Sequence, residues 1–126
     1  MVNIRYVWEK SQSLDIMTVK PLNPVVGENW VEFFKSNLGN FNKDNFFLIA
    51  DLVGVEENIK AEEFSQMADQ FIRHGIKKVC IIVLTLNSEY LKLGRLFESM
   101  AELKKLDLKV NFLKNKDEAI SWMEDQ

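Results

Sequence analysis

The sequence has few of the residues that build metal and redox sites, since it contains one histidine and one cysteine. A zinc site of ordinary composition takes roughly four nitrogen or sulfur ligands, so it cannot be assembled from this set. One cysteine cannot form an internal disulfide, and its presence suits a reducing compartment. Cys80 lies in the apolar run "VCIIVL", where we expect a small core side chain. We expect no metal centre.

Motifs for nucleophilic catalysis and phosphate binding are also missing. His74 precedes Gly75 at the predicted end of a helix, where an imidazolium favours the helix dipole. No Gly-x-Ser-x-Gly segment presents a serine nucleophile. The segment "DLVGVEEN" holds a single glycine, so it is neither a Walker loop nor a dinucleotide fingerprint. We expect no enzymatic activity and no cofactor.

Charge and hydropathy exclude two further classes. Sixteen Lys and Arg face nineteen Asp and Glu, for a net charge of −3, and basic residues form no cluster larger than pairs. Nucleic-acid binding is therefore not expected. The start "MVNIRYVWEKSQS" lacks the apolar stretch of a signal peptide, and no run approaches the roughly 18 apolar residues of a membrane span. We expect a cytoplasmic protein without a membrane span.

What the sequence does contain is one core's worth of apolar residues arranged in alternating strands and helices. Its 126 residues are 47% hydrophobic, and no linker divides them, so residues 1–126 form a single domain. The predicted strands are an initial hairpin at 4–9 and 14–20 with the polar turn "KSQS", two continuous apolar strands at 46–50 and 78–84, and an alternating edge strand at 108–113.

Helices are predicted from apolar spacing and terminal residues. Phe64, Met67, Ala68, Phe71 and Ile72 form one stripe of the second helix, and Phe71 should face the central strands. The predicted helices are 28–38 ended by Gly39, 61–74 ended by Gly75, a third from the caps Asn87 and Ser88 to about 105, and a last one opened by an Asn115 to Glu118 capping box.

The resulting order, β-β-α-β-α-β-α-β-α, predicts an α/β fold. Strands that alternate with helices pair in parallel through right-handed crossovers. We therefore expect a single five-stranded mixed sheet in which strands two to five are parallel and the first is antiparallel, with the strands at 46–50 and 78–84 in the centre and helices packed on the sheet.

Asp51 ends the strand at 46–50, and it resembles the phosphoacceptor of receiver domains. Asp51, Thr85 and Lys114 fall at the ends of the third, fourth and fifth strands. Phosphoryl transfer also needs a divalent cation held by further carboxylates. The first strand ends Trp8-Glu9-Lys10, without the acidic pair that a receiver supplies. A degenerate receiver is thus the lesser alternative, and we expect Asp51 to shape a loop.

The order of elements and two segments resemble the SpoIIAA-like group of STAS-type domains. The segments are "FLIADLVGVEENIKAEEF" and the closing "NKDEAISWMED". The resemblance implies a non-catalytic regulatory or protein-interaction module, with a fold similar to that of small Sec14-type lipid-binding domains. In the family a phosphorylated Ser starts the following helix, whereas this chain has Glu56-Glu57-Asn58-Ile59-Lys60. A phosphate beside Glu56 and Glu57 would meet like-charge repulsion.

Two functions remain open. The first is a protein-interaction module whose partner meets the loops at 51–60 and 85–90. The second is a carrier of a small apolar or lipid-like ligand held between a helix and the sheet, which a closed apolar cavity would favour. The expected partner-binding residues of the first are Asp51, Gly54, Asn58, Lys60, Thr85 and Tyr90.

The third predicted helix carries more apolar residues than one stripe requires. Leu96 and Leu103 stand seven apart on one side. Their strip is either an exposed surface for self-association as a homodimer or a flank covered by the last helix with Trp122.

Overall fold

The protein is built around one mixed sheet, seen in a computed structural model that describes residues 4–11, 14–39, 44–87 and 89–126. The strand order is β1-β2-β4-β6-β7. β1 pairs antiparallel with β2, and all other neighbours are parallel, which confirms the predicted topology. The bounds are β1 Ile4–Ser11, β2 Leu14–Pro21, β4 Phe46–Asp51, β6 Lys78–Leu84 and β7 Asp107–Leu113.

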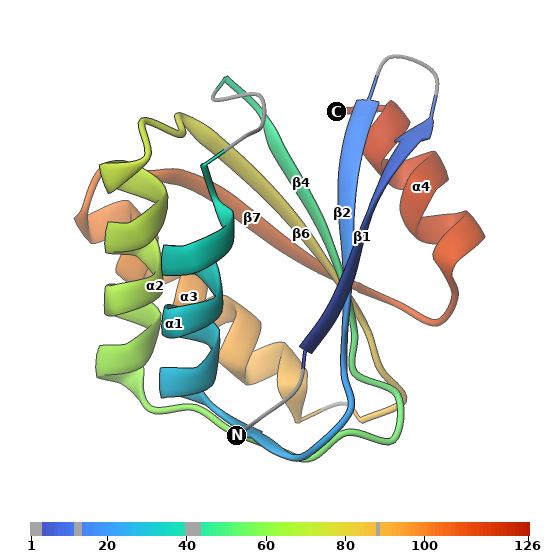
Figure 1. Cartoon of the computed structure of the whole chain (residues 1–126), viewed down its shortest axis with the longest axis horizontal. Helices are drawn as coiled ribbons and strands as arrows, with labels where there is room; N and C mark the ends of the chain where they lie inside the picture. Colours follow the sequence, from blue (N-terminus) through green and yellow to red (C-terminus); the bar gives the residue numbers. More distant parts are fainter. Residues whose placement is uncertain (1–3, 12–13, 40–43, 88) are drawn as a thin grey trace.

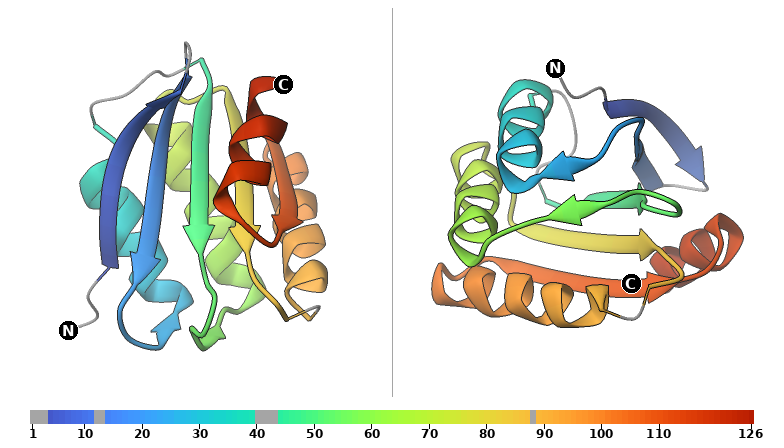
Figure 2. Two further views of the ribbon diagram at one scale, coloured as in Figure 1. Left: turned by 90° about the vertical axis from the view of Figure 1, so that its right-hand side faces the viewer. Right: turned by 90° about the horizontal axis from the view of Figure 1, so that it is seen from below.

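Helices cover both faces of the sheet, as Figures 1 and 2 show. α1 (Gly27–Asn37), α2 (Ala61–Arg73) and α3 (Tyr90–Leu103) lie side by side on one face, and α4 (Lys116–Glu124) lies on the other. The sheet is therefore the middle layer of three.

The two central strands are apolar throughout because both of their faces are buried. Leu48 and Ala50 of β4 join the core under α1, α2 and α3. Phe47 and Ile49 join a second core with Ala119 of α4. Cys80 of β6 belongs to that second core, where it is 1% exposed, and burial raises the pKa of its thiol. The expected core role of Cys80 is confirmed.

The apolar stripe of α2 is confirmed except at one end. Phe64, Met67, Ala68 and Phe71 are buried, with Phe71 at 0% exposure. Ile72 is 41% exposed, so its place on the stripe was wrong, because a helix turns about 100° between Phe71 and the next residue. Gly75 ends the helix at φ 76°, as predicted.

Other helix ends differ from expectation. Gly39 does not adopt a left-handed φ. Helix α1 instead closes at Leu38, whose N–H donates to the Phe34 carbonyl at 3.2 Å. Helix α3 ends at Leu103, and shortly after it Lys105 adopts a left-handed φ of 62°. Asn115 Oδ1 accepts from Glu118 N–H at 2.9 Å, which confirms that cap.

The turns and short strands between these elements were predicted only in part. Residues 12 and 13 of the predicted turn, and Ser88 of the predicted cap, lie outside the described residues. Asn87 Oδ1 accepts from Glu89 N–H at 3.0 Å in the turn before α3. A two-stranded parallel pair, β3 (Val25–Val26) with β5 (Glu57–Asn58), was not predicted. Within the described segments, none of the helices has the length and apolar character to cross a membrane.

Candidate functional site

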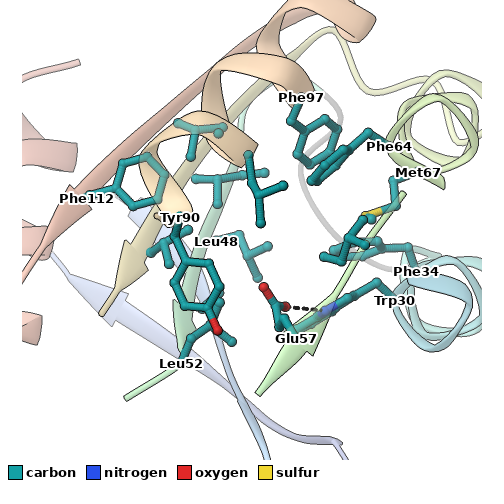
Figure 3. Close-up of a pocket in the computed structure, with 17 residues that line it drawn as sticks. Trp30, Phe34, Leu48, Leu52, Glu57, Phe64, Met67, Tyr90, Phe97 and Phe112 are labelled. Atoms are coloured by element: carbon teal, nitrogen blue, oxygen red, sulfur yellow. Dashed lines mark hydrogen bonds between the residues drawn. The ribbon is translucent and has the colours of Figure 1, made fainter. Parts of the chain in front are cut away.

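An apolar pocket lies between the sheet and α1, α2 and α3 (Figure 3). Its volume is about 70 Å³. Strands β4, β6 and β7 form its floor, and the three helices form its walls. The lining residues are Trp30, Phe34, Leu48, Ala50, Leu52, Glu57, Ile59, Phe64, Met67, Ile81, Val83, Tyr90, Leu93, Gly94, Phe97, Val110 and Phe112.

Aromatic packing and one glycine define the walls. The rings of Phe64 on α2 and Phe97 on α3 lie with centroids 4.9 Å apart, so the two helices close one end. Gly94 allows α3 to lie close to β7, because a Cβ there would come within 2.5 Å of the Phe112 ring. Glu57, Tyr90 and Phe112 keep partial exposure to water.

Among the described residues that line the pocket, Glu57 is the one with an acidic or basic side chain. β5 pairs Glu57 with Val25 beside the start of α1, and Trp30 Nε1–H donates to Glu57 Oε1 at 2.6 Å. Figure 3 shows the other carboxyl oxygen turned away from Trp30 toward the pocket. The site therefore combines an apolar wall with one oriented carboxyl group.

The protonation of Glu57 is shifted by its surroundings. Burial raises the pKa of its carboxyl from 4.5 to about 7, and the hydrogen bond from Trp30 opposes that rise. Burial penalises the charged form where no cation compensates it. None of the ion pairs between described residues involves Glu57. Near neutral pH the carboxyl thus exists in both charged and neutral forms.

Tyr90 links the pocket to the loop that follows β4. Its hydroxyl donates to the Val55 carbonyl at 2.9 Å. Burial, with the nearby charge of Glu57, raises the pKa of the Tyr90 phenol. Tyr90 is therefore a neutral wall residue whose hydrogen holds the loop in place.

Asp51 lies at the carboxyl end of β4, outside the pocket. Its Oδ1 accepts from Val53 N–H at 3.2 Å and lies 3.4 Å from Lys20 Nζ. Lys20 Nζ also donates to the Val53 carbonyl at 2.8 Å. The carboxylate thus shapes the loop between β4 and β5, the role expected from sequence. Thr85 and Lys114 follow the neighbouring strands β6 and β7, with Thr85 N–H 3.4 Å from the Leu113 carbonyl.

The other predicted partner-binding residues occupy the same end of the sheet. Gly54 is exposed in the loop at φ 73°. Asn58, the last residue of β5, and Lys60, between β5 and α2, are also exposed. Thr85 Oγ1 accepts from Asn87 N–H at 3.1 Å. The structure brings one of them, Tyr90, into the pocket. In the described part of the chain no three His, Cys, Asp or Glu side chains form a group that could hold a metal ion.

The two leucines of the apolar strip on α3 differ in their exposure to solvent. Leu103 is 80% exposed, whereas Leu96 is partly buried and packs against the core. Helix α4 with Trp122 packs on the opposite face of the sheet, so it does not cover either leucine. The homodimer hypothesis is left with Leu103 as its one strongly exposed member.

Trp30 and Glu57 were not singled out as a pair from sequence, although one signal was available. Val55, Glu57 and Ile59 alternate, and Val55 and Ile59 both pack against the core. Side chains two apart in extended chain share a face, so a glutamate between them points inward. The Trp30 partner is 27 residues away, and sequence periodicity does not reveal it.

Comparison with known proteins identifies the fold. The structure is similar to that of an uncharacterized protein from the DUF3478 family, with a SpoIIAA-like fold, from Shewanella loihica PV-4. The TM-score is 0.64 at 13% identity, over 97% of this chain and 94% of that one. The chain thus has a SpoIIAA-like α/β fold, as the sequence resemblance implied. The likeness to Sec14-type domains has no support from this match. No protein-family model and no curated protein matches the chain.

Proposed function

We propose that this protein is a non-catalytic binding domain that holds a small, mainly apolar ligand in the pocket between the sheet and α1, α2 and α3. The observation that carries the proposal is an apolar pocket with one oriented carboxyl group, lined by residues from three helices and four strands. Ligand sites are commonly concave and apolar, with few polar groups that fix orientation.

The size of the pocket limits the ligand. An engineered apolar cavity of about 150 Å³ admits benzene, and the volume of about 70 Å³ here is smaller. A short alkyl group fits this space, and the rest of a longer ligand would extend past Tyr90 and Phe112, which are partly exposed.

Titration with a neutral probe tests the proposal. We expect 1-pentanol to shift the indole N–H signal of Trp30 in a nitrogen-15 correlation spectrum, saturably and at millimolar concentration. Trp30→Phe assigns the signal among the three tryptophans. Native mass spectrometry of the protein purified from its own host would show whether a natural ligand stays bound.

A variant whose pocket is filled by a larger side chain should not bind the probe. Ala50 lines the pocket, so Ala50→Leu should abolish the pentanol shift. Ala61→Leu adds the same atoms at an exposed position at the start of α2 and should leave it unchanged. Equal binding by wild type and Ala50→Leu would contradict the proposed site.

A second candidate, a protein-interaction module, is favoured by the loops at the carboxyl edge of the sheet. Val53 follows β4 and is 40% exposed, and Leu86 follows the neighbouring β6 and is 76% exposed. Apolar side chains displayed on adjacent loops suit a partner surface. Affinity capture from the host with wild type and with Val53→Asp/Leu86→Asp tests it: a partner lost only from the double variant supports this function.

A further inference from the structure

We infer that the pocket selects a ligand whose polar head is an ammonium cation, with a short alkyl or aryl group in the apolar part. This inference rests on the proposed function and names the chemistry of its ligand. It follows from which polar atoms of the pocket wall are already bonded and which remain for a ligand.

Three polar side chains reach the wall, and two of them use their donors within the protein. The Trp30 N–H is given to Glu57 at 2.6 Å, and the Tyr90 O–H is given to the Val55 carbonyl at 2.9 Å. Glu57 uses one oxygen to accept from Trp30, and its other oxygen faces the pocket (Figure 3). The wall thus presents a carboxyl oxygen and no free N–H or O–H donor of Trp30 or Tyr90 to an incoming head group.

The negative charge of the Glu57 carboxylate has no compensating cation in the pocket wall that the structure describes. No lysine or arginine of the described segments lines the pocket, and a half-buried carboxylate is stabilised by an opposite charge within a few ångströms. An ammonium head would supply both that charge and a hydrogen bond to the free oxygen. The aromatic walls suit the same ligand, since Trp, Tyr and Phe faces attract cations.

Other ligand heads fit less well. A carboxylate head would face Glu57 with like charge, and none of the described lining residues carries a cation that would offset it. A neutral carbonyl or ether head would need Glu57 protonated as the donor. The sign of the pH dependence therefore separates an ammonium ligand from a neutral acceptor.

The other titratable groups around Glu57 do not change the expected sign of the pH dependence of ligand affinity. β3 contributes none, and α1 contributes Trp30, which does not titrate. Glu28 and Glu32 of α1 line a separate groove toward α2, and Glu63 of α2 accepts from Lys60 N–H. Glu56 is the exposed neighbour in the loop. Tyr90 of α3 has a pKa raised above 10, so it stays neutral between pH 6 and 8.

Three probes with one chain length and different heads test the inference: pentylammonium, 1-pentanol and pentanoate. The readout is the Trp30 indole signal, whose hydrogen points at Glu57. We expect pentylammonium to bind at least fivefold more tightly than 1-pentanol at pH 8 and pentanoate to bind weakest. From pH 6 to pH 8 the affinity for pentylammonium should rise about tenfold, because a proton on Glu57 competes with the cation.

Charge removal gives an independent measurement. Glu57→Gln keeps an oxygen for Trp30 but has no charge, so the preference for pentylammonium over 1-pentanol should disappear while pentanol binding remains. Glu56→Gln should behave as wild type.

The outcomes distinguish the two proposals. Pentanol binding that equals or exceeds pentylammonium binding at pH 8, or a pentylammonium affinity that falls as pH rises, overturns the ammonium inference and leaves the proposed function standing. Binding of none of the three probes overturns both. Should Glu57→Gln fail to fold, the pH series on the wild type still decides.

Discussion

Phe34 of α1 and Phe71 of α2 lie with ring centroids 4.9 Å apart, and Phe71 lies 5.5 Å from the Phe46 ring of β4. All three side chains are at most 2% exposed. The contact joins two helices to a central strand, next to the pocket wall formed by Phe34. The stability of that wall therefore depends on Phe71, which does not itself line the pocket.

Truncation of this ring should be costly. We expect Phe71→Ala to lower the free energy of unfolding by about 3–5 kcal/mol, the usual range for a buried aromatic residue. Urea denaturation followed by circular dichroism measures it. Ile72→Ala, on the adjacent and 41% exposed position, is the control and should cost under about 1.5 kcal/mol. A loss below about 1 kcal/mol for Phe71→Ala would contradict the packing.

The stability of the protein should fall as pH rises through the range in which the Glu57 carboxyl loses its proton. Its carboxyl has a pKa of about 7 in the fold against an ordinary 4.5, so the folded state binds more protons than the unfolded state between these values. Linkage then lowers stability from pH 4.5 to 7, by about 1–3 kcal/mol from this group, with no further change above.

Paired variants isolate this contribution. Chemical denaturation at pH 5, 6, 7 and 8 should show a smaller decline in Glu57→Gln than in wild type. Glu56→Gln removes an exposed carboxylate one residue away and should retain the wild-type decline. Identical pH profiles for wild type and Glu57→Gln would show that the carboxyl is not held in an environment that favours its neutral form.

Asp51 should not accept a phosphoryl group. Its Oδ1 is engaged by Lys20 and by Val53 N–H, and among the described residues no acidic pair stands beside it to hold magnesium. Incubation with acetyl phosphate and Mg²⁺ should leave the intact mass unchanged. A stoichiometric adduct that disappears in Asp51→Asn would revive the receiver interpretation.

The two leucines of α3 should respond differently to substitution. Leu96 packs against the core while Leu103 is 80% exposed, so Leu96→Lys should lower the melting temperature by several degrees and Leu103→Lys should leave it nearly unchanged. Sedimentation of the wild type at high micromolar concentration tests the homodimer directly. A dimer that Leu103→Lys converts to a folded monomer would support the self-association hypothesis, and a wild-type monomer would end it.

The sequence was sufficient for the framework because periodicity reports local burial. Continuous apolar runs identified β4 and β6, and Gly75 marked the end of α2. It failed where a contact joins distant segments. The β3 and β5 pair, and the Trp30 to Glu57 bond, depend on segments about thirty residues apart that meet only after the sheet and helices assemble. For the same reason the sequence suggested a ligand held between a helix and the sheet without indicating which residues would line the pocket, and the candidate residues it did indicate lie mostly in the exposed loops.

The burial of Cys80 gives the chain an internal reporter of its own opening. The thiol sits in β6 between β4 and β7, under α4, and is 1% exposed, so a bulky thiol reagent has to wait until α4 leaves the sheet or the fold opens. The rate of labelling under native conditions then measures the free energy of that opening. Because Cys80 faces α4 while the pocket lies on the other side of the sheet, a ligand that slows labelling would do so by stabilising the whole fold and not by shielding the thiol.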